Sequence, residues 1–176
     1  LKAICSKIES IEQLVVVPVI QDAVAIDGFG NAILFHDFLS AHRGAALFCE
    51  QLPFNHPLYI MYSSGTTGAP KCIVHSAGGT LIQHLKEHQL HVDLKPSDRL
   101  FYFTTCGWMM WNWLVSALAS GATLVLYDGS PFYPEAKSLI DLVEAEQVSI
   151  FGTSAKYLSA LEKAGVNPNK THDLAQ

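Results

Sequence analysis

The stretch that decides the fold of this chain is Tyr62-Ser63-Ser64-Gly65-Thr66-Thr67-Gly68-Ala69-Pro70-Lys71. An apolar run at 58–61 precedes it and a β-like run at 72–75 follows it, so the sequence predicts a loop between two strands. Glycines let a backbone turn sharply and come close to a ligand. Hydroxyls, exposed N–H groups and a lysine bind phosphate oxygens. We therefore predict a polyphosphate-binding loop, with an ordinary polar turn as the alternative.

This loop differs from the Walker loop of kinases and GTPases. Four residues after Gly65, a Walker loop continues with Gly-Lys-Ser/Thr, whereas this chain has Pro70-Lys71-Cys72. A Walker loop is therefore excluded, and phosphate binding is not.

The pattern on either side of the loop is that of an α/β protein. Upstream, we predict a helix at 35–42 and a strand at 14–20, in which Pro18 indicates either a position near the edge of a sheet or an early end. Downstream, Ser76 is a candidate N-cap for a helix. From residue 99 strands and helices alternate, which predicts a mostly parallel sheet with helices on both faces. The predicted strands are 100–104, 122–127 and 148–151, and the predicted helices are 108–120, one beginning at Pro134, and 154–164 closed by Gly165.

Residues 101–127 contain no charged side chain. One interpretation is a transmembrane helix. Polar and glycine residues interrupt the run at intervals suited to strand–helix–strand, so we favour a buried strand and helix and no membrane span.

The composition is that of a folded protein of one domain. The chain has 176 residues, 49% of them hydrophobic and 15% charged, and a net charge of −5. Lysine and arginine do not cluster, which argues against nucleic acid as a partner. The four cysteines form no CxxC pair, so we expect reduced, mostly buried thiols in a cytoplasmic protein. The start lacks a secretory signal and is not Met, so we expect an internal piece of a longer protein.

The residues from Ser63 to Lys71, Ser-Ser-Gly-Thr-Thr-Gly-x-Pro-Lys, resemble the signature loop of the adenylate-forming enzymes. This superfamily includes acyl-CoA synthetases, luciferases and peptide-synthetase adenylation domains. The flanks narrow the resemblance to the acetoacetyl-CoA synthetases, and the likeness runs from about Ile11 to Gln176. The flanking segments are 73–76, 78–79, 84–86, 107–112, 126–129 and 151–156.

The resemblance implies that residues 1–176 are a fragment of the large N-terminal, AMP-binding domain, with the C-terminal domain absent. It implies an ATP-dependent acid–thiol ligase of lipid or ketone-body metabolism. Acetoacetate would react with Mg-ATP to give an acyl-adenylate and pyrophosphate, and the thiol of coenzyme A would then displace AMP. Family motifs for adenine, ribose and Mg²⁺, and a C-terminal lysine, lie outside these residues. We therefore expect the fragment alone to be inactive, and we name no metal ligand.

The resemblance also assigns roles within the loop. The loop would hold the β- and γ-phosphates, and Lys71 would neutralise the departing pyrophosphate, so Lys71 and Thr67 are the expected catalytic residues. Cys72 stands where the family commonly has glycine, which changes the backbone freedom after the loop. The predicted nucleotide-binding residues are Ser63, Ser64, Gly65, Thr66, Thr67, Gly68 and Lys71.

For the acid, the resemblance points to an acyl pocket lined by Trp108, Met109, Met110 and Trp111, with core packing as the alternative for each. Asn112 could orient a polar group of the substrate. Ser154 matches a position near the pantetheine channel.

Two further expectations come from the residues themselves. Ligands of open α/β sheets gather at the carboxyl ends of strands, so the segments 63–71, 104–108 and 152–154 should converge on one crevice. His84, His88 and His91 share a helix face. This spacing favours a solvated polar face, with a zinc site as the alternative.

Rival functions remain open. Within the superfamily they are another short- or medium-chain acyl-CoA ligase, or an adenylation domain that feeds a carrier protein. Outside enzymes, the rival is a truncated nucleotide-binding module without catalysis.

Overall fold

The computed structural model describes residues 2–20, 24–40, 42–63 and 68–175 and forms two compact units, Leu1–Gln51 and Leu52–Gln176. The prediction that the whole chain is part of one domain stays a prediction. The first unit contains helix α1 (Lys2–Cys5), strands β1 (Leu14–Val16) and β2 (Ala32–Leu34), and helix α2 (Phe35–Ser40). β1 pairs with β2 in parallel. β1 ends two residues before Pro18, as predicted, since proline has no N–H for a strand partner.

The second unit begins with a hairpin of two strands, β3 (Pro57–Ser63) and β4 (Lys71–Ser76), which are antiparallel. This confirms the prediction of strands on both sides of the loop. Ser76 is the N-cap of helix α3 (Ala77–Lys86), which continues as a π-helical turn, η1 (Glu87–His91).

A three-stranded parallel sheet follows, in the order β6-β5-β7. Its strands are β5 (Arg99–Tyr102), β6 (Thr123–Val125) and β7 (Ile150–Gly152). Between them run helix α4 (Met109–Ser116), the 3-10 turn η2 (Ala117–Ser120), and helix α5 (Ser138–Ala145). Helices α6 (Ala155–Lys163) and α7 (Pro168–Thr171) complete the described chain.

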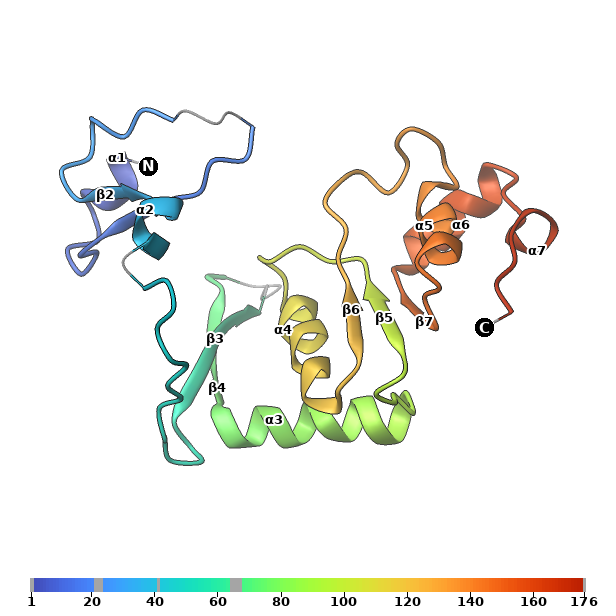
Figure 1. Cartoon of the computed structure of the whole chain (residues 1–176), viewed down its shortest axis with the longest axis horizontal. Helices are drawn as coiled ribbons and strands as arrows, with labels where there is room; N and C mark the ends of the chain where they lie inside the picture. Colours follow the sequence, from blue (N-terminus) through green and yellow to red (C-terminus); the bar gives the residue numbers. More distant parts are fainter. Residues whose placement is uncertain (1, 21–23, 41, 64–67, 176) are drawn as a thin grey trace. The chain divides into compact units, whose positions relative to one another are not determined.

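Both faces of this sheet are covered, as predicted. Neighbouring residues of β5 point to opposite faces, and they lie in two different core clusters. Leu100 is fully buried in a core cluster with Leu94, Leu114 and Ala117. Phe101 lies in the other cluster, with α5 and α6 supplying side chains that include Leu139 and Leu161. Figure 1 shows α4 and the pair α5 and α6 as separate layers of the second unit. The predicted strand–helix–strand path through 101–127 is confirmed, and in the described part of the chain no helix is long and apolar enough to cross a membrane.

Two local predictions were wrong. The helix predicted from Pro134 begins at Ser138, because the Ser138 hydroxyl bonds to both the N–H and the carbonyl of Glu135 and forms a turn there. The thiols are free but not mostly buried: Cys49, Cys72 and Cys106 are exposed. Cys72 belongs to β4, a strand in which all residues but the last are exposed.

Candidate functional site

The hairpin holds the two ends of the predicted phosphate loop together. Ser63 and Lys71 are paired across β3 and β4, so a hydroxyl and an ammonium group stand at the base of the loop. Lys71 is exposed, and a Cβ added to Gly68 would meet no atom of the described residues within 4 Å. Ser64, Gly65, Thr66 and Thr67 lie outside the described residues. Their roles, and those of Ser63, Gly68 and Lys71, stay predictions.

The hairpin packs against α4, the helix with the predicted acyl-pocket residues. The Asn112 side-chain amide donates to the Met61 sulfur at 3.3 Å, and thioether sulfur is a weak acceptor. The Asn112 amide therefore links α4 to β3.

The four residues predicted to form one acyl slot do not share one face. Met109 and Met110 line a cavity of about 650 Å³, whereas Trp111 lines a different one of about 490 Å³. Trp108 lines neither and is 54% exposed. Successive residues of a helix point about 100° apart, so Trp111 lies on another side of α4 from Met109. That these residues form one acyl slot stays a prediction.

The larger of these two spaces, here called the histidine cavity, is enclosed by β4, α3 with η1, Tyr102 of β5, and α4. Its wall mixes apolar side chains of α4 with polar side chains of the helix opposite. It is lined by Val74, His75, Ser76, Gly79, Thr80, Gln83, His84, Glu87, His91, Val92, Tyr102, Met109, Met110 and Trp113.

A hydrogen-bond network fastens α3 and η1 to α4. The Glu87 carboxylate accepts from Gln83 Nε2 at 2.7 Å and from the Trp113 indole N–H at 2.9 Å. His88 Nε2 lies 3.0 Å from the Trp113 carbonyl oxygen and 3.0 Å from Ser116 Oγ. Glu87 and His88 belong to the π-helical turn, a feature frequent at functional sites.

Two histidines of this region are held neutral by their surroundings. Burial lowers the pKa of His84 below its ordinary value, and nearby His75 lowers it further while Glu87 opposes the shift. Burial also lowers the pKa of His88, against the hydrogen bond from its ring to Trp113. In both residues Nδ1 is buried without a hydrogen-bond partner among the described residues.

The solvated face predicted for His84, His88 and His91 is therefore wrong at His88, which is 0% exposed. Its partners, Trp113 and Ser116, are 25 and 28 residues away, so helix periodicity alone gave no signal of its burial. Within the described ranges, no group of three metal-binding side chains is placed to hold a metal ion.

The carboxyl ends of two strands meet as predicted. Phe103 N donates to the Gly152 carbonyl at 2.9 Å, so the segments after β5 and β7 are neighbours. The 490 Å³ cavity lies at the ends of β5 and β6, where Thr104, Thr105 and Cys106 line it. Convergence of all three segments on one crevice stays a prediction.

Ser154 has a structural task in this chain. Its hydroxyl oxygen accepts from Tyr157 N at 3.2 Å and caps α6. The prediction that it lies near the pantetheine channel is not tested by this contact.

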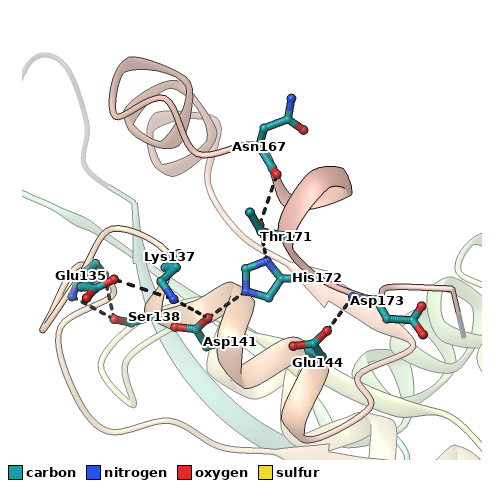
Figure 2. Close-up of polar contacts among 9 residues, drawn as sticks. All are labelled: Glu135, Lys137, Ser138, Asp141, Glu144, Asn167, Thr171, His172 and Asp173. Carbon is teal, nitrogen blue, oxygen red and sulfur yellow. Dashed lines mark hydrogen bonds and ion pairs between the residues drawn. The ribbon is translucent and has the colours of Figure 1, made fainter.

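A second polar cluster joins α5 to the end of α7 (Figure 2). His172 Nε2 lies 2.8 Å from Asp141 Oδ1, and His172 Nδ1 lies 2.8 Å from Thr171 Oγ1. The order hydroxyl–imidazole–carboxylate resembles a nucleophile relay, but the Thr171 hydroxyl donates to the Asn167 carbonyl at 3.3 Å. These contacts join α5 to the end of α7, and we interpret the cluster as a tie between two helices.

Comparison with known proteins defines the class. Residues 7–176 match the family of AMP-binding enzymes, so the chain belongs to that family. It is 57% identical over 162 residues to acetoacetyl-coenzyme A synthetase of Rhizobium meliloti (strain 1021), covering 92% of this chain and 25% of that protein. Over 122 residues it is 57% identical to malonamoyl-CoA synthetase of Penicillium aethiopicum, covering 64% of this chain and 17% of that protein.

A solved structure agrees with these sequence matches. Acetoacetyl-CoA synthetase from Streptomyces lividans superposes with a TM-score of 0.85 at 41% identity, covering 99% of this chain and 26% of that chain. The predicted α/β fold of an adenylate-forming enzyme is confirmed. The chain spans about a quarter of the length of the acetoacetyl-CoA synthetases it matches.

Proposed function

We propose that the natural full-length protein is an ATP-dependent acid–thiol ligase that makes acetoacetyl-CoA. The observation that carries the proposal is that the hairpin and α4 enclose one cavity: β4 contributes His75 and Ser76, and α4 contributes Met109 and Met110. The element that ends in the phosphate loop and the helix assigned to the acid are thus parts of one structure, which suits a reaction between a phosphate and a carboxylate.

The proposed chemistry has two steps. The carboxylate oxygen attacks the α-phosphorus of ATP, the bond to the β-phosphate oxygen breaks, and pyrophosphate leaves. The thiol of coenzyme A then attacks the acyl carbon and AMP leaves. The protein mainly positions the reactants and stabilises developing charge.

Within this scheme the loop binds the β- and γ-phosphates. Lys71 offsets the negative charge that builds on the leaving pyrophosphate, and Thr67 donates a hydroxyl to it. The paired, accessible positions of Ser63 and Lys71 fit a polyphosphate. The described residues do not offer a set of carboxylates for Mg²⁺, so we assign no step to them through the metal.

The names of two relatives narrow the class of acid that we propose as the substrate. An acetoacetyl and a malonamoyl group are both short acyl chains with a carbonyl on the β-carbon, and they differ by a methyl group against an amino group. We therefore propose short β-carbonyl acids as the substrate class, with acetoacetate as the physiological one. The free cysteines of the described chain support a reducing compartment, such as the cytosol.

The test is acid-dependent ATP–pyrophosphate exchange by the full-length protein with acetoacetate, acetate, butyrate and octanoate. We expect the highest exchange with acetoacetate, and a loss of at least about tenfold in Lys71→Ala and Thr67→Ala, since charge-stabilising groups at phosphates contribute on this scale. No exchange with any acid, from protein shown to be folded, would favour the non-catalytic binding module.

A further inference from the structure

His84 is a half-buried imidazole on the wall of the histidine cavity. Its Nδ1 is buried and has no hydrogen-bond partner within the described ranges. Since Nδ1 is closed off from the cavity, Nε2 is the ring nitrogen that remains for a ligand.

The surroundings also decide which nitrogen carries the proton. Burial lowers the pKa of His84, so the ring is neutral near pH 7 and carries one N–H. A buried N–H without an acceptor is rarer in proteins than an under-satisfied acceptor, so the proton belongs on Nε2. His84 then presents a hydrogen-bond donor to the cavity.

The polar neighbours of His84 are engaged or exposed. Gln83 and Glu87 bond to each other, and Glu87 also accepts from Trp113. His75 and His91 are exposed. His84 is the half-buried imidazole of this wall that keeps a nitrogen for a ligand, and the wall of the same cavity on α4 includes Met109 and Met110.

We infer that the histidine cavity receives the acyl chain and that His84 Nε2 donates a hydrogen bond to the β-carbonyl oxygen of the acid. The inference rests on the proposed function and deepens it by naming the residue that selects β-carbonyl acids. Butyrate has the same carbon skeleton as acetoacetate without the oxo group, so it leaves this donor unpaired. A site built to bond a polar group discriminates strongly against the analogue that lacks it.

The experiment compares exchange with acetoacetate and with butyrate in four full-length proteins: the natural one, His84→Leu, His84→Gln and Gln89→Leu. Leucine removes the donor, and glutamine keeps an N–H at similar reach. Gln89 is exposed on η1, the π-helical turn that continues α3, and it lines none of the described cavities. Its substitution therefore controls for a general change in this helical segment.

We expect His84→Leu to lower kcat/KM for acetoacetate by roughly 10–100-fold, the size expected for an unpaired buried polar group, and to leave butyrate within about threefold. His84→Gln should recover part of the acetoacetate activity, and Gln89→Leu should match the natural protein. Exchange with butyrate shows that each variant is folded.

The outcomes separate the two proposals. An acetoacetate to butyrate ratio that is unchanged in both His84 variants would overturn the role of His84 while the ligase proposal stands. Equal losses with both acids in the leucine and glutamine variants would also overturn it. No exchange with any acid in the natural protein would remove the ligase proposal and this inference together.

Discussion

Tyr157 carries a hydroxyl that is buried without a hydrogen-bond partner among the described residues. Its ring packs 5.3 Å from Phe132 and 6.3 Å from Phe151, measured between centroids. Because the ring supplies the packing and the hydroxyl only a desolvation cost, Tyr157→Phe should keep or raise the free energy of unfolding, by up to about 1 kcal/mol. Urea unfolding of the full-length protein at pH 7 measures this.

The matched control is Tyr133→Phe, because Tyr133 is 75% exposed and its loss should change little. A clear loss of stability in Tyr157→Phe alone would mean that its hydroxyl has a partner. The same burial raises the pKa of Tyr157 to about 12, so this residue resists ionisation when folded. Its contribution to stability is therefore full below pH 10 and declines as pH rises above that value.

Gly152 sits where a side chain would strike Tyr102. A Cβ built on Gly152 would lie 2.1 Å from Tyr102 Cδ2 and 2.9 Å from Cγ, so the ring must move. Tyr102 lines both the histidine cavity and the cavity at the strand ends. Gly152→Ala should therefore lower stability by about 1–3 kcal/mol and lower acetoacetate-dependent exchange.

The control for Gly152→Ala is Gly30→Ala, where the added methyl meets nothing within 4 Å in the described part of the chain. Thermal unfolding and exchange on the same samples give both readouts. If Gly152→Ala kept full stability and full exchange, Tyr102 would not be held in its place by the bare backbone beside it.

At the scale of an element, α4 divides its residues between two cavities. Met109 and Met110 face the histidine cavity and Trp111 faces the other. Met109→Phe puts a bulkier side chain on the wall of the first cavity and leaves less room in it, so kcat/KM for octanoate should fall by at least about tenfold relative to that for acetoacetate. Trp111→Leu should leave the ratio between these acids within about threefold.

ATP–pyrophosphate exchange with each acid gives these ratios. If Trp111→Leu changed the octanoate to acetoacetate ratio and Met109→Phe did not, the acyl chain would instead lie in the cavity at the strand ends. Either result decides between the faces, since both residues belong to the same two turns of one helix.

At the scale of the whole described chain, the sequence predicted what depends on neighbours in sequence. Alternation of apolar runs and turn residues located the hairpin, β5 to β7 and the helices between them, because the buried face of each element leaves a periodic pattern in its own sequence. It did not predict the burial of His88, which depends on Trp113 and Ser116 of another helix. Nor does the sequence show that Met110 and Trp111 line different cavities, because the two residues are adjacent in the chain and the helix turns by about 100° between them.

The two neutral histidines give the protein a predicted pH dependence. His84 faces Glu87 and His75, and His88 faces His84, Glu87 and Trp113, with burial lowering the pKa of both. The unfolded chain therefore binds protons more tightly at these positions than the folded one. Their contribution to stability is complete above the ordinary histidine pKa of about 6.5 and is lost as pH falls from there through the lowered folded values.

His88→Gln removes one of these titrations and keeps an N–H that can reach the Trp113 carbonyl. We expect the full-length variant to be less stable than the natural protein at pH 7.5, because an amide fills the buried site less well. Its melting temperature should fall less between pH 7.5 and 5 than that of the natural protein. Gln89→Leu, on the exposed side of the same turn, should keep the natural slope. Parallel slopes for the natural protein and His88→Gln would show that His88 takes up no proton on unfolding in this range, and the buried ring would then be a packing group alone.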